Sequence, residues 1–467
     1  MPLQAINPAT EEVVATYPES TPAQVDEALA QAHAAYGAWR TTSFAERAKA
    51  VRGLAATLRD RKAKLARLIT TEMGKPITES EAEIEKCAWN CEYYADNGER
   101  FLANEAIATN ARESYVQFTP LGVVLAIMPW NFPFWQVIRF AAPAMMAGNA
   151  AVLKHASNVP GCGLAIEDLF RAGGFPDGIL RTVLVPGAAA EQMIADPRVR
   201  AVTLTGSDIA GARVAAAAGH ALKKLVLELG GSDPYIVLAD ADLDAAATVA
   251  AKARNINAGQ SCIAAKRFIV VEDVADAFEA RFKAAVEALK IGDPLDPATQ
   301  IGPMARGDLR DALQDQVQRS VAMGAQVLTG GAPREGKGYY YPPTILTHVT
   351  PEMPVFREET FGPVAAVIRA RDEDAALALA NDTVYGLGSN LWTADMDRAR
   401  TLARRIEAGA VFINGMVASD PRLPFGGVKR SGYGRELSAF GIREFVNIQT
   451  VWIGPAATTA PVQTATE

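Results

Sequence analysis

From Gly122 onward, short unbroken runs of valine, leucine and other apolar residues alternate with stretches of helical periodicity. A strand with one face in water alternates apolar with polar residues, so unbroken runs are typical of strands buried on both faces. Such strands occur in parallel sheets with helices on either side. The runs form two series, one at 122–128, 150–154, 181–185, 199–205 and 224–229, the other at 267–271, 364–369, 387–393 and 409–414. The pattern predicts an α/β protein with two doubly wound units.

A chain of 467 residues is too long for a single hydrophobic core, so we expect two or three domains. The first hundred residues have helical periodicity, with helix starts predicted at Thr21 and Ser43. One long helix is predicted from Ser43 to Gly74. Residues 114–118 and 444–453 are strand candidates, and although they lie far apart in the chain they can pair as one flap.

Charge and hydropathy exclude several classes of partner. The net charge is −7, with acidic and basic residues interspersed, whereas nucleic acid or an anionic membrane surface requires a basic stripe. No apolar stretch reaches the roughly 18 residues of a membrane span. The segment Met1–Pro8 has neither the basic nor the apolar region of a signal peptide. We therefore expect a cytoplasmic protein with no nucleic-acid or membrane partner.

The cysteines and histidines predict neither a disulfide framework nor a metal site. Four cysteines in a chain of this length are too few for such a framework. Cys87 and Cys91 lie four residues apart on a predicted helix, but no histidine is near them in the sequence. Buried thiols are therefore favoured over a zinc site, and no metal is expected.

Two stretches of unusual sequence supply a thiol and a carboxylate. Cys262 follows Gly259-Gln260-Ser261, and Glu228 precedes a pair of glycines. A thiolate is the attacking form of cysteine, so a nucleophilic site must supply a base or a positive potential. Taken alone, a single cysteine is more often a small core residue. A carboxylate such as Glu228 can equally be one half of a salt bridge.

Seven motifs, in order along the chain, decide between these interpretations. They are Pro129-Trp130-Asn131-Phe132-Pro133, Lys154 with Ser157, Thr205-Gly206-Ser207, Glu228-Leu229-Gly230-Gly231, Gly259-Gln260-Ser261-Cys262, Glu358-Glu359-Thr360-Phe361-Gly362-Pro363 and Pro424-Phe425-Gly426-Gly427. With these motifs the chain resembles the NAD(P)-dependent aldehyde dehydrogenases from about Asn7 to about Trp452. Within that family it is most similar to the succinate semialdehyde dehydrogenases of the short bacterial type.

The resemblance implies an organisation of the chain. The fold expected is the aldehyde dehydrogenase fold, with two doubly wound α/β domains and a small β-flap for oligomerisation. The expected dinucleotide-binding domain comprises residues 1–110 and 123–230, the catalytic domain 231–440, and the flap 111–122 and 441–455. Residues 456–467, rich in Ala, Thr, Pro and Gln, are expected to be a flexible tail. A family member with such a flap is expected to be a homodimer or homotetramer.

The resemblance also assigns the catalytic roles. Cys262 would attack the aldehyde carbon, and Glu228 would activate water to hydrolyse the resulting thioester. The side chain of Asn131 and the backbone N–H of Cys262 would stabilise the oxyanion. Asn131 alone is equally typical of a turn or a helix N-cap. Many relatives carry a second cysteine two residues after the nucleophile. Here Ala264 takes that place, so a disulfide between neighbours is excluded.

No G-x-G-x-x-G motif follows an early strand, an absence that the chain shares with the family. The cofactor residues that the resemblance implies are Trp130, Lys154, Ser157, Thr205, Gly206, Ser207, Leu229, Glu359 and Phe361. Gly206 would let the pyrophosphate approach a helix start at Ser207. Relatives that prefer NAD usually carry glutamate where Ser157 stands, and a glutamate there would repel a 2′-phosphate. Ser157 leaves Lys154 free to bind that phosphate, so we expect NADP to be preferred and NAD to be possible.

Arg139 is the candidate for substrate choice, because a guanidinium pairs well with a distal carboxylate. If the segment is helical, Asn131, Trp135 and Arg139 share one face. By resemblance, Ser261 and Ser419 would also contact the substrate, and Trp135 and Phe425 would be apolar walls. Alternatively, Arg139 is one half of a surface ion pair.

The leading hypothesis for the function is oxidation of succinate semialdehyde to succinate. The alternatives are a broad-specificity enzyme, one for another ω-carboxy aldehyde, and an idle or thioesterase-type protein.

Overall fold

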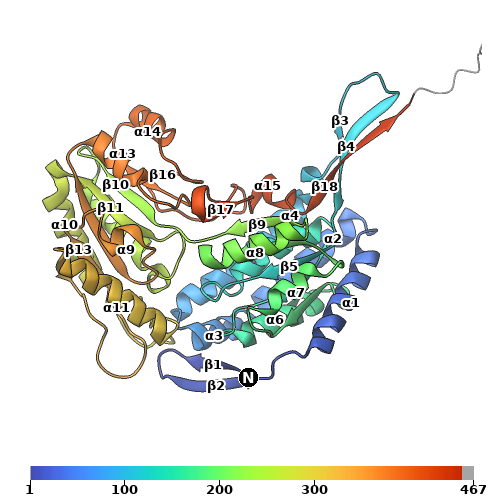
Figure 1. The fold of residues 1–467 in the computed structure, drawn as a ribbon, viewed down its shortest axis with the longest axis horizontal. Coiled ribbons are helices and arrows are strands. Elements are labelled where there is room, and N and C mark those ends of the chain that lie inside the picture. The colour runs from blue at the N-terminus through green and yellow to red at the C-terminus, as the bar shows by residue number, and fades with distance from the viewer. Residues whose placement is uncertain (1, 455–467) are drawn as a thin grey trace, which may run out of the picture.

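The computed structural model describes residues 2–454, and two large sheets organise this part of the chain (Figure 1). The first sheet has the strand order β17-β9-β8-β5-β6-β7. Its strands are β5 (Val123–Ile127), β6 (Ala150–Lys154), β7 (Leu180–Val183), β8 (Val199–Thr205), β9 (Lys224–Glu228) and β17 (Gly432–Tyr433). All pairs are parallel except that of β17 with β9. The first series of predicted strands is therefore confirmed to within a few residues.

The second sheet has the order β12-β13-β14-β11-β10-β15-β16 and is parallel except at the β12 edge. Its strands are β10 (Asp233–Val237), β11 (Ala265–Val271), β12 (Gln326–Thr329), β13 (Thr344–Thr347), β14 (Val364–Ala370), β15 (Asn390–Trp392) and β16 (Phe412–Ile413). The second predicted series corresponds to β11, β14, β15 and β16. The strands β10, β12 and β13 were not among the predicted runs.

Both faces of the second sheet are buried, which explains why its strands are apolar without alternation. Tyr235 and Val237 of β10 pack in one core with α9 (Leu243–Asn255) and α10 (Glu272–Glu287). Ile236, between them, points into a separate core on the opposite face. That core includes residues of α11 (Gly307–Ala322), α12 (Pro354–Arg357), α13 (Glu373–Asn381) and α14 (Met396–Ala403).

The first sheet shares one core with the helices around it. These are α1 (Pro22–Trp39), α2 (Phe44–Asp60), α3 (Lys62–Met73), α4 (Ile77–Phe101), α5 (Trp135–Met146), α6 (Pro160–Ala172), α7 (Ala189–Ala195), α8 (Asp208–His220) and α15 (Ser438–Ile442). Thr21 and Ser43 each form the capping box that starts a helix. The single helix predicted from Ser43 is wrong, because the chain leaves helical geometry at Arg61 (φ −98°, ψ 9°). The antiparallel strands β1 (Leu3–Asn7) and β2 (Glu12–Tyr17) were also not predicted.

The predicted pairing of distant strands is confirmed. β18 (Val446–Ile453) pairs along its whole length with β4 (Glu113–Pro120), and β4 pairs with the two-residue strand β3 (Glu105–Ala106). This three-stranded flap projects from the body of the molecule (Figure 1). The predicted tail, 456–467, lies outside the described residues. In residues 2–454, no helix combines the length and apolarity required to cross a membrane.

Candidate active site

The motif residues meet because parallel strands bring their carboxyl ends to one edge of a sheet. Lys154, Thr205 and Glu228 are the last residues of β6, β8 and β9. Asn131 follows β5, which lies between β6 and β8 in the same sheet. Cys262 comes from the second sheet, in the loop that leads into β11. The site therefore lies where the loops of the two sheets meet.

Two cavities flank Cys262 and share it, together with Gln136. The first, which we call the α4–α5 cavity, is lined by Glu79, Ala82, Glu83, Lys86, Phe132, Trp135, Gln136, Arg139, Ala253, Ile256, Ser261, Cys262, Ile263, Met416, Val417, Ala418, Ser419 and Phe425. The second, the β8–α8 cavity, is lined by Pro129, Trp130, Asn131, Gln136, Thr205, Gly206, Ser207, Leu229, Gly230, Cys262, Arg306, Leu309, Glu359 and Phe361. All five predicted substrate residues line the first. All predicted cofactor residues except Lys154 and Ser157 line the second.

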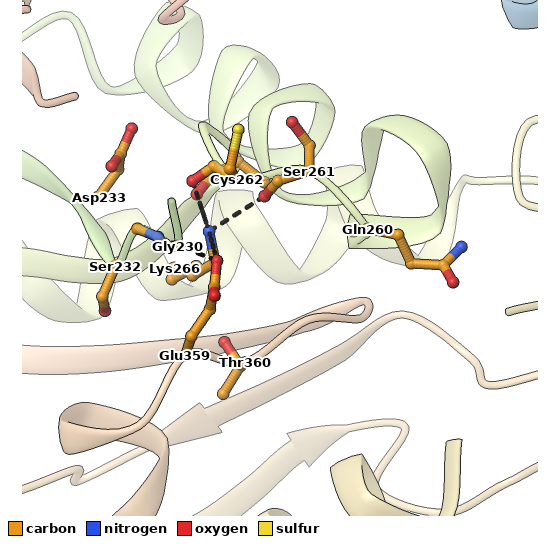
Figure 2. A network of polar contacts seen from close by, with 12 residues as sticks. Gly230, Ser232, Asp233, Gln260, Ser261, Cys262, Lys266, Glu359 and Thr360 are labelled. Atoms are coloured by element: carbon orange, nitrogen blue, oxygen red, sulfur yellow. Dashed lines mark hydrogen bonds and ion pairs between the residues drawn. The ribbon is translucent and has the colours of Figure 1, made fainter. Parts of the chain in front are cut away.

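The loop that carries Cys262 is held by a buried lysine. Lys266 donates through Nζ to the carbonyl oxygens of Ser261 (3.1 Å), Cys262 (2.9 Å) and Ala264 (3.2 Å). Its ammonium also lies 3.6 Å from Oε1 of Glu359. Figure 2 shows Lys266 between the loop and Glu359, while the sulfur of Cys262 points away from it. Lys266 therefore fixes the backbone and leaves the sulfur free.

Burial raises the pKa of the Cys262 thiol to about 12, although the charges of Arg139 and Lys266 act in the opposite direction. The thiol is thus almost wholly protonated at neutral pH. It stays accessible to small molecules, because the residue is only partly buried and lines both cavities. A site of this kind suppresses unproductive thiol chemistry until a ligand supplies positive potential.

Asn131 is held in a network around the nucleophile loop. Its Nδ2 donates to the carbonyl oxygen of Gln260 (3.0 Å), and its own carbonyl oxygen accepts from Nδ2 of Asn257 (2.8 Å). An amide nitrogen carries two hydrogens, so one N–H remains for an oxyanion. Asn257 and Ala258 have φ values of 53° and 50°, in the left-handed region. This backbone strain shapes the turn just before Cys262.

Glu228 is buried and lines neither cavity. Burial raises the pKa of its carboxyl well above the usual range, and the nearby carboxylate of Glu436 raises it further. Neither carboxyl oxygen of Glu228 has a hydrogen-bond partner among the described residues. A carboxyl group without partners is free to rotate, and Oε1 lies 2.8 Å from where a side chain at Gly426 would begin. Its role as a base therefore stays a prediction that requires the side chain to swing toward Cys262.

Arg139 lines the α4–α5 cavity, but its positive charge already has an acidic partner in the protein. Its guanidinium is almost fully buried and forms an ion pair with Glu436. The guanidinium carbon also lies 4.6 Å from the centre of the Phe425 ring, and Nη2 is 3.4 Å from Oγ1 of Thr205. The alternative of a surface ion pair does not fit this burial. Binding of a substrate carboxylate by Arg139 stays a prediction.

The β8–α8 cavity ends at the start of a helix. Ser207 is the N-cap of α8 and accepts from the N–H of Ala210 (3.2 Å), as predicted. Asp208, in the first turn, is paired with Arg430 (2.9 and 2.7 Å), so its charge is compensated. A Cβ at Gly206 would meet only Leu204, 3.6 Å away, which leaves the backbone open to a ligand. This helix start is suited to an anion.

Lys154 and Ser157 lie beside this region, at the end of β6 and just beyond it. Ser157 is exposed, and Lys154 is half-buried, with no ion pair or hydrogen bond to its ammonium group among the described residues. Burial lowers the pKa of Lys154. Between them, His155 accepts the N–H of Ala156 at Nδ1 (2.8 Å), so its Nε2 donates to the carbonyl oxygen of Pro133 (2.8 Å). Burial lowers the pKa of His155 to about 4, consistent with this neutral form.

At the other end of the β8–α8 cavity, Glu359 accepts from the N–H of Gly231 (3.0 Å) and faces Lys266. It is therefore not a solvated surface carboxylate. Phe361 packs edge-to-face on Trp130, with ring centres 5.7 Å apart. The pair forms an aromatic wall next to Cys262 in the same cavity. These residues are placed where a planar ring could lie against the sulfur.

Three residues of the site, Lys266, Glu436 and Lys86, were not identified from the sequence patterns. Lys266 stands only four residues after Cys262, so its position in the sequence was a usable signal. Glu436 and Lys86 gave no signal, since their partners Arg139 and Ser419 lie about 300 residues away in the chain. Within residues 2–454, no group of three or more His, Cys, Asp or Glu is arranged to hold a metal ion.

Comparison with known proteins agrees with this geometry. A model of the aldehyde dehydrogenase family matches residues 1–451. A succinate-semialdehyde dehydrogenase [NADP(+)] of Mycolicibacterium paratuberculosis is 52% identical over 458 residues, covering 97% of each chain. The crystal structure of succinic semialdehyde dehydrogenase from Streptococcus pyogenes with NADP+ superposes with a TM-score of 0.95 at 38% identity, covering 97% of this chain and 100% of that one. An NAD-dependent aldehyde dehydrogenase from Sinorhizobium meliloti gives a TM-score of 0.95 at 36% identity, covering 99% and 93%.

Proposed function

Since the chain belongs to the aldehyde dehydrogenase family, we propose that it oxidises succinate semialdehyde to succinate with NADP. The observation that carries the proposal is the position of Cys262, whose side chain borders both a cavity lined in part by Lys86 and Arg139 and a cavity that ends at a helix start. The names of the relatives from Mycolicibacterium and Streptococcus point to the same substrate and cofactor. In this proposal the first sheet and its helices bind the dinucleotide, and the second sheet supplies the nucleophile.

The Cys262 thiol gives up its proton to water, the thiolate sulfur attacks the aldehyde carbon, and the spare N–H of Asn131 stabilises the oxygen on which charge develops. Losing one such donor typically lowers the rate by about 100- to 1000-fold. After the hydride leaves, the substrate is a thioester on Cys262. Glu228 then rotates out of its buried position toward the sulfur, ionises there, and as a carboxylate takes a proton from the water that hydrolyses the thioester. Its isolated, unpaired carboxyl is suited to such a movement.

Bound NADP would accept the hydride. The chain offers a place for each of its parts: the open backbone at Gly206 and the α8 start for the pyrophosphate, and the Trp130–Phe361 wall beside Cys262 for the ring. Lys154, a half-buried cation without a partner in the described chain, suits the 2′-phosphate. No carboxylate stands at position 157 to repel that phosphate, so NADP is preferred and NAD remains usable.

The alternative within the class is a broad-specificity enzyme or one for another ω-carboxy aldehyde. The test is the rate of NADPH formation with succinate semialdehyde and with butanal, each repeated with NAD. The proposal expects a strong preference for the carboxylated aldehyde with NADP. Equal rates with the two aldehydes would overturn the substrate assignment and leave only the family's general reaction.

We further propose that the protein acts in the cytoplasm as a homodimer or homotetramer. Its cysteines are all unpaired, as is typical of a reducing compartment. Ile448 and Trp452, both on the edge strand β18 of the flap, are 64% and 51% exposed. An apolar, unpaired strand edge is a surface that a second subunit can cover.

A further inference from the structure

Helix α4 places a lysine in the wall of the α4–α5 cavity. Nζ of Lys86 donates to Oγ of Ser419 (2.7 Å) and lies 4.4 Å from the centre of the Trp135 ring. Both neighbours also line this cavity, as does Cys262. The ammonium is therefore fixed by a hydroxyl and an aromatic face in the same space that the nucleophile borders.

Lys86 differs from Arg139, Lys75 and Lys266 in having no carboxylate partner among the described residues. Arg139 is paired with Glu436, Lys75 with Glu83, and Lys266 with Glu359. In residues 2–454, no carboxylate oxygen lies within ion-pair distance of Lys86. A poorly solvated cation without an anion is unfavourable, and an anionic ligand would remove that cost.

The nearest acidic groups do not neutralise the Lys86 ammonium, because each has other partners. Asp420, beside Ser419, is bound by Arg422 at 2.9 and 2.6 Å. Glu83, on the same helix, accepts from Lys75 and from the N–H groups of Phe134 and Trp135. The carboxyl of Glu79 also lines the cavity, but it accepts from the N–H of Asn257 (2.8 Å), and burial raises its pKa to about 7.

We propose that Lys86 and Ser419 bind the distal carboxylate of the substrate, which makes Lys86 the residue that selects a carboxylated aldehyde. Because Oγ of Ser419 accepts from Lys86, its own O–H is left to donate to a second acceptor. A carboxylate is an acceptor only, and here it meets one ammonium and one hydroxyl donor. The inference rests on the proposed function. It extends that function by assigning recognition of the substrate carboxylate to Lys86, because Arg139 is already paired with Glu436.

The test compares Lys86→Met, which keeps the length of the side chain and removes the charge, with Lys86→Arg, which keeps the charge. With Lys86→Met, KM for succinate semialdehyde should rise by about 10- to 100-fold, the usual effect of losing a charged hydrogen bond. KM for butanal and kcat should change by no more than about twofold. Lys86→Arg should recover part of the loss. Lys49→Met, which removes an exposed charge on α2, is the matched control and should change neither KM.

Two outcomes would overturn the inference: an unchanged preference in Lys86→Met, or an equal loss with both aldehydes, which would indicate a structural role. Failure of the proposed function gives a different result, since the unmodified enzyme would then show no preference for the carboxylated aldehyde.

A pH profile gives a second readout. Burial, and then the charge of Arg139, lower the pKa of Lys86 to about 8; Glu83 and Asp420 oppose this. The ratio of kcat/KM for the two aldehydes cancels the chemistry at Cys262 that they share. That ratio should fall as the pH rises above 8, because the ammonium then loses its proton. A ratio that stays constant up to pH 9 would contradict the assignment.

Discussion

The sulfur of Cys262 borders both cavities, and burial of the residue controls its reactivity. A thiol whose pKa is about 12 has very little thiolate at neutral pH. The free enzyme is thereby protected from alkylation and oxidation without a neighbouring cysteine, since position 264 is alanine. Activation must come with the ligands, whose positive charge would lie in the adjoining cavity.

Alkylation of the free enzyme by iodoacetamide should therefore be slow at pH 7 and accelerate roughly tenfold per pH unit up to pH 9, in proportion to the thiolate. The modified residue, located by peptide mass spectrometry, should be Cys262. The remaining three cysteines are fully buried and serve as internal controls. A rate that levels off near pH 8 would mean that the thiol pKa is not raised.

Replacing Ser157 by glutamate should shift the cofactor preference toward NAD. A carboxylate near the 2′-phosphate repels it by about 1–2 kcal/mol, so kcat/KM for NADP should fall about 5- to 30-fold while that for NAD is maintained or rises. Ser157 is exposed, so the substitution is not expected to disturb folding. Ser157→Gln, similar in size and neutral, is the matched control. An unchanged preference in Ser157→Glu would refute the role of this position.

At this scale, the sequence indicates residue types well but not their partners. The resemblance to the family implied the roles of Asn131, Trp130 and Phe361, and the structure brings all three to the β8–α8 cavity. The ion pair of Arg139 with Glu436 could not, since the two residues lie on elements that only the fold brings together. For the same reason the sequence does not single out Lys86, whose partner Ser419 lies on another element.

At the scale of elements, the nucleophile loop depends on one side chain from β11. Lys266 connects three carbonyl oxygens of that loop to Glu359. The cation is fully buried, so its loss leaves Glu359 without its partner. The loop and the Glu359 side of the β8–α8 cavity are thus coupled through Lys266.

Lys266→Met should lower the stability of the protein by about 3 kcal/mol, the usual effect of removing one partner of a buried ion pair. The measurement is the thermal midpoint by circular dichroism, and kcat at 25 °C should fall as well. Lys49→Met, on the surface of α2, should alter neither quantity. An unchanged midpoint and kcat would show that the loop holds its conformation without this lysine.

The strands of both sheets were the most predictable elements, because burial on two faces leaves an unbroken apolar pattern. The strands missed, β10, β12, β13 and β17, are interrupted by polar, glycine or proline residues or lie at an edge of a sheet. The break between α2 and α3 has no glycine or proline to mark it. Its cause is tertiary packing, which local periodicity does not record.

At the scale of the whole molecule, the flap is the part that a single chain leaves incomplete. Figure 1 shows β4 and β18 extending away from the body, and β18 is an edge strand. Strand edges with exposed apolar side chains are otherwise prone to aggregation. In the proposed oligomer, a second subunit would cover this edge.

The double variant Ile448→Lys and Trp452→Glu should convert the oligomer into monomers, because it places charges on the surface that would be buried. Light scattering after gel filtration gives the mass. Leu222→Lys, at a residue that is 94% exposed and outside the flap, is the matched control and should keep the original mass. If the double variant stays oligomeric, the flap is not the interface.

The central claim, that Cys262 carries the substrate and Glu228 releases it, is tested most directly by trapping the thioester. Glu228→Gln mixed with NADP and succinate semialdehyde should give a burst of about one NADPH per subunit and then very slow turnover. Mass spectrometry should find one succinyl group on the peptide that contains Cys262. Steady turnover at the original rate, or a burst with no adduct on Cys262, would contradict the account.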